Sequence, residues 1–302
     1  MFGLKLLRKL DLVLLVSTLV LLVIGLAVLY SSGIKAARVV SEIDTSRQFL
    51  YAAAGLAVML FFARLDYRVL RNYSIILYII MVASLVAVDV FGATRLGATR
   101  WISIGFFQFQ PSEFAKPMLA IVLAQHFSRH YDHINEFKYW FGSLMYLVLP
   151  LGLVLAQPDL GTGMVFVVIW FAMAIAARVR WQYLAGLVTS VVVMIPLIIP
   201  RLKPYQQQRI TTFLDPTANP ATTGYNVNQA IIAVGSGGWL GQGLGSGSQS
   251  QGNFLPSQHT DFIFAVLAEK LGFLGGLLTI ATFLVLMLRS FWISQMAPDK
   301  FV

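Results

Sequence analysis

Long apolar segments separated by short polar ones form the dominant pattern of this 302-residue chain. A helix needs about 20 mostly apolar residues to cross the roughly 30 Å hydrocarbon core of a bilayer. The segments that meet or approach this length lie near 10–30, 47–63, 74–91, 111–127, 139–156, 161–177, 183–200 and 261–288. The pattern predicts an all-α polytopic membrane protein with about eight transmembrane helices. We expect one membrane domain over residues 1–302, interrupted by one long loop at 201–260.

Composition supports this class. The chain is 58% hydrophobic and only 12% charged, and its mean hydropathy is +0.75. It has no cysteine, which excludes disulfides, thiolate catalysis and cysteine-ligated metals. Its net charge is +9, and in a chain this apolar the basic surface favours membrane lipids and phosphorylated lipids over nucleic acid. The first apolar segment is too long for a cleavable signal and lacks a small-residue cleavage site.

The distribution of Lys and Arg predicts the orientation. If the N-terminus is cytoplasmic, every short inner loop is basic, as the positive-inside rule requires. The loop 201–260 is then extracytoplasmic, and so are the polar ends of several helices. The sequence therefore predicts that ionisable groups from separate segments meet at the outer membrane face.

Two of these groups, Glu113 and Lys116, lie three residues apart at the start of a predicted helix and can pair on one face. A structural interpretation is a helix capped by Ser112 with one lysine that reaches toward the interface. The other interpretation is a buried network that connects this helix to Glu269 and Lys270 of the last helix, because an unpaired ammonium inside a membrane is costly.

Three further residues carry two interpretations each. Asp159, in Gln157-Pro158-Asp159-Leu160-Gly161-Thr162, is either a helix N-cap or a substrate contact. Trp101 is either an interfacial anchor or a substrate contact. Arg100 beside it is a phosphate-binding candidate, although arginine in a loop is usually only solvated.

Two motifs resemble binding sites without the expected context. His126, His130 and His133 have a spacing that suggests metal ligands, but they fall in and after a helix end, where a solvated linker is the better interpretation. Gly241-Gln242-Gly243-Leu244-Gly245 follows no predicted strand, so it is a weak nucleotide signal. Its glycines can still allow close backbone approach to a sugar or pyrophosphate, or let the loop move as a lid.

The most informative stretch is Pro256-Ser257-Gln258-His259-Thr260-Asp261-Phe262-Ile263-Phe264-Ala265, where a polar loop enters an apolar helix. It places Asp261 at the boundary between water and membrane. A carboxylate is costly there unless it is paired or used. This position suits a general base that acts on a substrate held at the membrane surface.

Four blocks together resemble the SEDS family, the shape, elongation, division and sporulation proteins of bacteria. They are Gly97-Ala98-Thr99-Arg100-Trp101, Gln110-Pro111-Ser112-Glu113-Phe114-Ala115-Lys116, the Gln157–Thr162 block, and the stretch from Phe254 through His259-Thr260-Asp261-Phe262 to Gly272. Further segments, such as Gly247-Ser248-Gln249-Ser250-Gln251, resemble its RodA-like elongation branch more than its FtsW-like division branch.

The resemblance implies a peptidoglycan glycosyltransferase of the bacterial cytoplasmic membrane that polymerises lipid II at the outer face. It also implies a class B penicillin-binding protein and the elongation machinery as partners. It makes Asp261 the essential acidic residue and puts Glu113, Lys116 and Arg209 on matching polar positions. Family members carry about ten helices, so we expect this chain to lack the C-terminal ones, which puts its own activity in doubt.

The expected mechanism is inverting: Asp261 takes the proton of the attacking sugar hydroxyl, and Arg209, Lys116 and Arg100 hold the pyrophosphate. His259 is a further substrate-binding candidate. The sequence identifies no cofactor, although a divalent cation such as Mg²⁺ or Mn²⁺ bridging pyrophosphate to Asp159 or Glu113 stays open. Two alternatives remain: a lipid II flippase or transporter, and a non-catalytic scaffold for the penicillin-binding protein.

Overall fold

The computed structural model describes residues 10–33, 45–95, 98–104, 107–201, 207, 211, 223–252, 254–255, 260–297 and 299–301. The chain forms two compact units. Unit 1 consists of residues 1–64 and 197–296, and unit 2 of residues 65–196 and 297–302. The single membrane domain predicted from the sequence stays a prediction.

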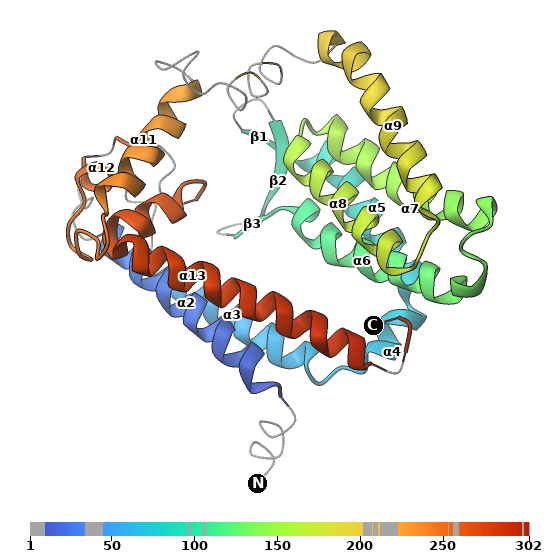
Figure 1. The fold of residues 1–302 in the computed structure, drawn as a ribbon, viewed down its shortest axis with the longest axis horizontal. Helices are drawn as coiled ribbons and strands as arrows, with labels where there is room; N and C mark the ends of the chain where they lie inside the picture. Colours follow the sequence, from blue (N-terminus) through green and yellow to red (C-terminus); the bar gives the residue numbers. More distant parts are fainter. Residues whose placement is uncertain are drawn as a thin grey trace. The chain divides into compact units, whose positions relative to one another are not determined.

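All eight predicted apolar segments are helices in the structure (Figure 1). Their bounds are α2 (Leu12–Gly33), α3 (Thr45–Phe62), α5 (Ser74–Phe91), α6 (Pro111–Arg129), α7 (Phe137–Ala156), α8 (Leu160–Ala176), α9 (Trp181–Ile198) and α13 (Ile263–Met296). Of the described helices, α2, α7 and α13 are long and apolar enough to cross a membrane, while α5, α8 and α9 contain shorter apolar stretches. The all-α polytopic fold is confirmed.

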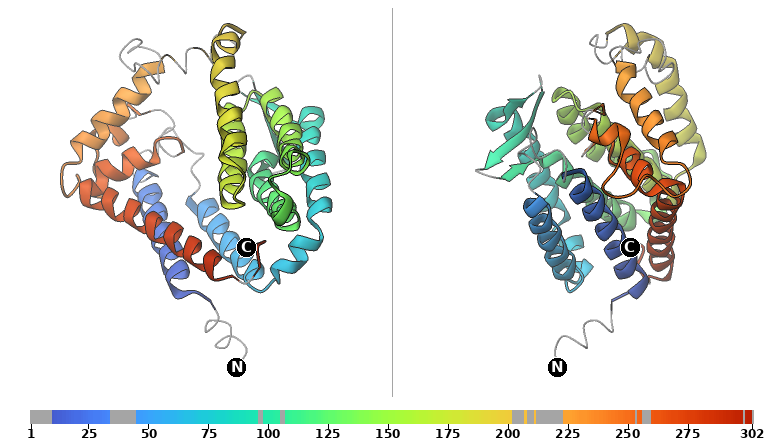
Figure 2. Two further views of the ribbon diagram at one scale, coloured as in Figure 1. Left: turned by 45° about the vertical axis from the view of Figure 1, so that its right-hand side comes forward. Right: turned by 90° about the vertical axis from the view of Figure 1, so that its left-hand side faces the viewer.

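Unit 1 is built on α2 and α13, which run side by side in every view, with α3 against α2 (Figures 1 and 2). Val28 of α2 packs with Leu255 and Val266 in an apolar cluster. At the other end of the pair, Asp11 accepts two hydrogen bonds from Arg289, at 2.7 and 2.9 Å. This ion pair joins the start of α2 to the far end of α13, so the two helices are antiparallel.

The loop predicted at 201–260 contains helices of its own. It begins with the 3-10 turn η2 (Ile199–Arg201) and includes α11 (Thr223–Ser236) and the single turn α12 (Ser248–Gln251). Both α11 and α12 contact the first part of α13. This part of the loop is therefore packed against unit 1.

Unit 2 contains α5 to α9 and the short helix α4 (Tyr67–Asn72), with the 3-10 turn η1 (Tyr131–His133) between α6 and α7. Its core is apolar and aromatic, with Leu119, Phe166 and Trp170 fully buried. The indole of Trp170 donates to the Ser143 hydroxyl at 3.1 Å, which satisfies a polar group inside this core.

A small antiparallel sheet in unit 2 was not predicted from the sequence. Its strands are β1 (Ala93–Arg95), β2 (Ala98–Ile104) and β3 (Phe107–Phe109), in the order β1-β2-β3. The register pairs Thr94 with Thr99 and Ser103 with Gln108. The sheet contacts α5 and α6, so it lies where one membrane helix ends and the next begins.

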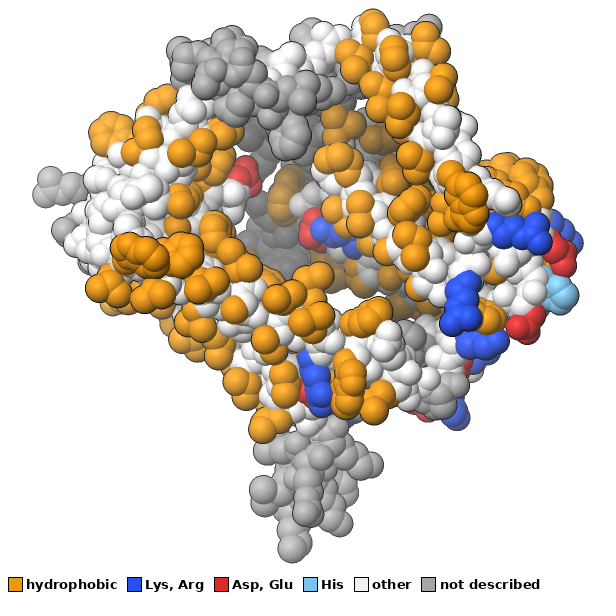
Figure 3. Space-filling view, in the orientation of Figure 1, with side chains coloured by type: hydrophobic (Ala, Val, Ile, Leu, Met, Phe, Trp, Pro, Cys, Tyr) orange, Lys and Arg blue, Asp and Glu red, His pale blue; other side chains and the backbone are white. Residues whose placement is uncertain are grey.

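Large hydrophobic side chains are exposed along most helices, as Figure 3 shows in orange. Val193, Phe283 and Met287 are each more than half exposed. Surfaces of this kind are expected where helices face lipid. Charged side chains gather instead around the connection between α6 and α7 (Figure 3).

Candidate functional site

Asp261 lies at the lip of a groove in unit 1, two residues before α13 begins. The groove has a volume of about 360 Å³. Apart from Asp261 its lining is apolar: Val227, Ala230, Ile231 and Val234 of α11, together with Phe262, Phe264 and Ala265. Asp261 is solvent-exposed and is the charged residue of this lining. The groove thus combines one accessible carboxylate with a wall suited to an apolar ligand.

The backbone around Asp261 explains why the carboxylate lies at the start of α13, at the lip of the groove. The Phe262 carbonyl accepts hydrogen bonds from the amides of Ala265 and Val266, at 3.0 and 3.2 Å, and so begins the helix. Asp261 precedes this turn, near the positive end of the helix dipole. Stabilisation of the helix start is therefore the structural interpretation of Asp261.

The glycine-rich segment before Asp261 packs backbone to backbone on α13. The amides of Gln242 and Gly243 donate to the carbonyls of Glu269 and Lys270, at 2.9 and 3.0 Å. A Cβ on Gly241 would lie 2.2 Å from the Lys270 oxygen, so only glycine fits there. Close packing within the protein accounts for this glycine, whereas the predicted contact with sugar or pyrophosphate and the predicted lid motion stay predictions.

Two charged residues at this packing site are completely buried. The Glu269 carboxylate accepts from the amides of Gln249 and Ser250, at 2.7 and 3.1 Å, and it thereby holds α12. The Lys270 ammonium donates to the Ser31 hydroxyl at the end of α2, at 2.9 Å. Both charges are costly inside an apolar helix, but their partners cannot be predicted from the sequence because they are distant along the chain.

The candidates Glu113 and Lys116 form an ion pair in the first turns of α6, with the Lys116 nitrogen 2.8 Å from both Glu113 oxygens. The Glu113 side chain is 53% exposed and that of Lys116 is 26% exposed. The predicted capping role of Ser112 is wrong: Pro111 is the first helical residue, Gln110 is the N-cap residue, and Ser112 is buried inside the first turn. The network predicted between Lys116 and the last helix stays a prediction.

Asp159 is a nearly buried N-cap of α8. Its carboxylate accepts from the Thr162 amide at 3.2 Å and from the Thr162 hydroxyl at 2.9 Å. In the same block, the Gln157 side chain donates to the Leu85 carbonyl at 2.8 Å, which ties this turn to α5. The structural interpretation of Asp159 therefore has direct support, and a substrate contact stays a prediction.

The structure describes some of the remaining candidates and not others. Trp101 is half-buried in β2, opposite Ala93 of β1. Arg100 precedes it in the same strand, and only its backbone is described. Arg209 and His259 lie outside the described residues. Their predicted roles at the pyrophosphate stay predictions.

The histidines near the end of α6 are engaged by neighbouring groups of the chain. A ring nitrogen of His126 lies 2.9 Å from the Tyr139 carbonyl, and one of His133 lies 2.8 Å from Glu136. His130 stacks on Tyr139, with ring centroids 4.4 Å apart. Among the described residues, no three or more His, Asp or Glu side chains gather as metal ligands. A divalent cation that bridges pyrophosphate to Asp159 or Glu113 stays a prediction.

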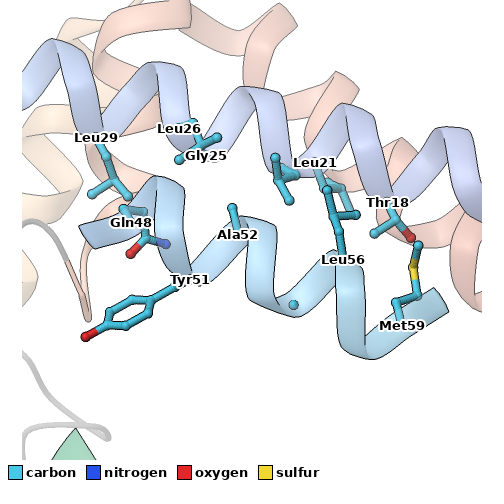
Figure 4. A pocket seen from close by; sticks show the side chains of 12 residues that line it. Thr18, Leu21, Gly25, Leu26, Leu29, Gln48, Tyr51, Ala52, Leu56 and Met59 are labelled. Atoms are coloured by element: carbon cyan, nitrogen blue, oxygen red, sulfur yellow. The ribbon is translucent and has the colours of Figure 1, made fainter. Parts of the chain in front are cut away.

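A larger pocket in unit 1 lies between α2 and α3, with a volume of about 490 Å³. Figure 4 shows Gly25, Leu26 and Leu29 of α2 facing Ala52 and Leu56 of α3, with Gln48 and Tyr51 at one end. Its lining contains no carboxylate, imidazole or amine. The α11–α13 groove is therefore the better candidate for the reaction, despite its smaller size.

Comparison with known proteins identifies the family of the chain. The family model FtsW/RodA/SpoVE, described as "Cell cycle protein", matches residues 12–302. The peptidoglycan glycosyltransferase MrdB of Escherichia coli K12 is 39% identical over 82% of this chain and 67% of the relative. The stage V sporulation protein E of Bacillus subtilis is 37% identical over 96% of this chain and 80% of the relative. A probable peptidoglycan glycosyltransferase FtsW of Geobacter metallireducens is 34% identical over 99% of this chain and 81% of the relative.

Solved structures show the same fold. A chain from a structure described as structural coordination of polymerization and crosslinking by a peptidoglycan synthase complex superposes with a TM-score of 0.76. It is 28% identical over 96% of this chain and 80% of its own length. The rod shape determining protein RodA of Thermus thermophilus gives a TM-score of 0.61 at 23% identity, over 96% of this chain and 77% of its own length. Sequence and fold together establish that the chain is an integral membrane protein that belongs to the FtsW/RodA/SpoVE family.

Proposed function

We propose that this protein is a peptidoglycan glycosyltransferase that polymerises lipid II during cell elongation, with Asp261 as its general base. The observation that carries the proposal is the exposed Asp261 carboxylate at the lip of the apolar α11–α13 groove. The names of the curated relatives MrdB and FtsW support the activity. A lipid-linked sugar matches the two properties of the groove, because it brings an apolar part and a hydroxyl to the same place.

In the proposed reaction Asp261 takes the proton of the acceptor's 4-hydroxyl, and that oxygen attacks the anomeric carbon of the donor sugar. The new bond between oxygen and anomeric carbon forms as the bond to pyrophosphate breaks, and pyrophosphate leaves as an anion. One base and one direct displacement invert the configuration. A positioned base contributes about 10²–10⁴-fold to the rate.

Positive charge for the leaving group would come from Lys116, Arg100 and Arg209. An ammonium or guanidinium beside departing pyrophosphate offsets its developing charge, and arginine can make two parallel hydrogen bonds to it. Lys116 is held by Glu113, so its charge is already oriented at the start of α6. The reaction face would be the outer one, with the N-terminus cytoplasmic.

The transport alternative needs ionisable groups along a path through the membrane. That alternative would use Glu113, Lys116 and Glu269, but Glu113 and Lys116 bind each other and Glu269 binds α12 inside unit 1. This arrangement favours a structural role for them and counts against a flippase. A class B penicillin-binding protein is the proposed partner, by analogy with the peptidoglycan synthase complex of the structural relative.

The test is lipid II polymerisation by purified protein with Asp261→Asn, which keeps the side-chain shape but removes its basicity. We expect the rate to fall by about 10²–10⁴-fold while the amount of folded protein stays unchanged. Asp132→Asn is the matched control, since Asp132 is an exposed carboxylate in unit 2. Unchanged polymerisation by Asp261→Asn would exclude the base role, and lipid II transfer across vesicles without polymer would favour the flippase.

A further inference from the structure

The helix that follows Asp261 is interrupted after nine residues. Gly272 has φ 68° and ψ −167°, so α13 consists of a short first part, residues 263–271, and a long second part after the break. The amides of Phe273 and Leu274 donate to the carbonyls of Gly238 and Trp239, at 2.8 and 3.2 Å, rather than continuing the helix. Because of this break, the long helix alone does not fix the direction of the short one.

Lys270 connects the end of the short helix to two other elements. Its ammonium donates to the Ser31 hydroxyl at 2.9 Å, and Ser31 in turn donates to the Leu244 carbonyl at 2.9 Å. This chain of two hydrogen bonds joins α13, the end of α2 and the glycine-rich segment. Lys270 is completely buried, so water does not compete for these bonds.

Glu269, the preceding residue, makes the second connection. Besides the amides of Gln249 and Ser250, the hydroxyl of Ser248 lies 3.4 Å from its carboxylate. All three groups belong to α12, which is a single turn and has little stability of its own. Glu269 therefore holds α12 against the short helix.

Two adjacent buried charges with separate partners cost free energy, because both lose their hydration. Removing a charge from water costs several kcal/mol unless hydrogen bonds replace the lost hydration. Apolar residues of similar volume at such positions often give the same stability or a higher one. In some proteins such buried charges specify one conformation among several. The element that they would orient is the helix that carries Asp261 at its other end.

We propose that Glu269 and Lys270 are positioning residues that hold the short helix, and with it Asp261, in one orientation at the groove. The inference rests on the proposed function for its effect on catalysis. A displacement of about 1 Å in a reacting group can lower a rate by about 100-fold. Loss of either contact should therefore lower the rate of the chemical step without removing any group that touches the substrate.

The first measurement is steady-state polymerisation by the full chain in detergent for Lys270→Met and Glu269→Gln. We expect kcat to fall by about 100-fold with KM changed by no more than about 2-fold. Thr282→Val is the matched control, since Thr282 is a buried polar residue of α13 beyond the break and bonds only to the Leu278 carbonyl of its own helix in the hydrogen bonds described. A rise in KM alone would indicate a substrate contact and would overturn the positioning role.

The second measurement does not depend on catalysis. The chain has no cysteine, so spin labels at Val23→Cys of α2 and Thr260→Cys beside Asp261 report one distance within unit 1. We expect a narrow distance distribution in the otherwise unchanged chain and a broadened or shifted one with Lys270→Met or Glu269→Gln. Identical distributions in folded protein would overturn the inference.

The two measurements separate the possible failures. If the unmodified chain makes no polymer while Lys270→Met still broadens the distance distribution, the proposed function fails and the positioning role stands. If polymerisation is robust but neither variant changes kcat or the distance, the function stands and the positioning role fails.

Discussion

Each unit contains a glutamate and a lysine close together in sequence, and the two pairs differ in what they do. Glu113 and Lys116 of unit 2 bind each other at the start of α6, where both side chains are partly exposed. Glu269 and Lys270 of unit 1 are fully buried, and each binds a different element. The comparison shows that charge type and spacing do not define a role. Whether such a pair lies on the surface of one helix or connects several segments depends on its burial and on the elements that supply its partners.

The largest expected effect comes from the break that separates the two parts of α13. Gly272→Ala places a side chain at φ 68° and ψ −167°, a region almost restricted to glycine, and its Cβ would lie 2.3 Å from the Gly241 nitrogen. We expect a loss of about 3 kcal/mol in the free energy of unfolding. Gly152→Ala in α7, where a Cβ meets open space, is the control for thermal unfolding. Equal melting temperatures for the two variants would contradict the described packing.

The comparison between the two pairs is tested directly by the same substitution in each. Glu269→Gln should cost about 2 kcal/mol, because it removes a charge that accepts two amide hydrogen bonds in a buried place. Glu113→Gln should cost less than about 1 kcal/mol, because its ion pair is exposed. Chemical denaturation in detergent measures both, and similar costs would remove the distinction drawn between the pairs.

Asp159 is an intermediate case, since it is nearly buried and caps its own helix through Thr162. Asp159→Ala should lower the stability of unit 2 by about 1 kcal/mol, the usual cost of losing an N-cap. Asp159→Asn should retain most of the stability that the N-cap provides, because the side-chain amide oxygen still accepts hydrogen bonds from Thr162. If instead both variants lose polymerisation at normal stability, Asp159 contacts the substrate.

The smallest effect concerns a partly exposed ion pair, Asp11 and Arg289. The hydrogen bond from Arg289 lowers the pKa of Asp11 below its ordinary value of 3.8. A lowered pKa means that the pair contributes stability above about pH 4 and loses this contribution as the pH falls through the folded-state pKa. Asp11→Asn should melt slightly earlier than the unmodified chain at neutral pH, and the difference should vanish in acid. A difference that is constant with pH would contradict the ion pair.

The eight long helices could be predicted from the sequence because each one is a mainly apolar run, and all begin within a few residues of their predicted ranges, although α13 continues to Met296. The helices α4, α11 and α12 were not predicted, because they are short or only partly apolar. The sheet β1–β3 was missed because its strands are short and follow a long helix directly. The cap of α6 was assigned to Ser112, since a serine before an acidic residue is a common start signal, but Pro111 already occupies the first helical position.

The site divides in the same way. The position of Asp261 could be predicted, because a carboxylate directly before an apolar helix is evident in the sequence, whereas its role as a base stays a prediction. The partners of Lys270 were not found, since Ser31 is 239 residues away and carries no signal of its own. The break at Gly272 was equally hidden, because the apolar run continues through it without a change in pattern.

The central claim is that the Asp261 carboxylate performs the chemistry rather than binding substrate or stabilising α13. Single-turnover formation of the glycosidic bond, started with lipid II already bound, tests this most directly. We predict that Asp261→Asn binds lipid II with unchanged affinity and forms the bond about 10²–10⁴-fold more slowly. A normal bond-forming rate, or a loss explained entirely by weaker binding or by unfolding, would contradict the account.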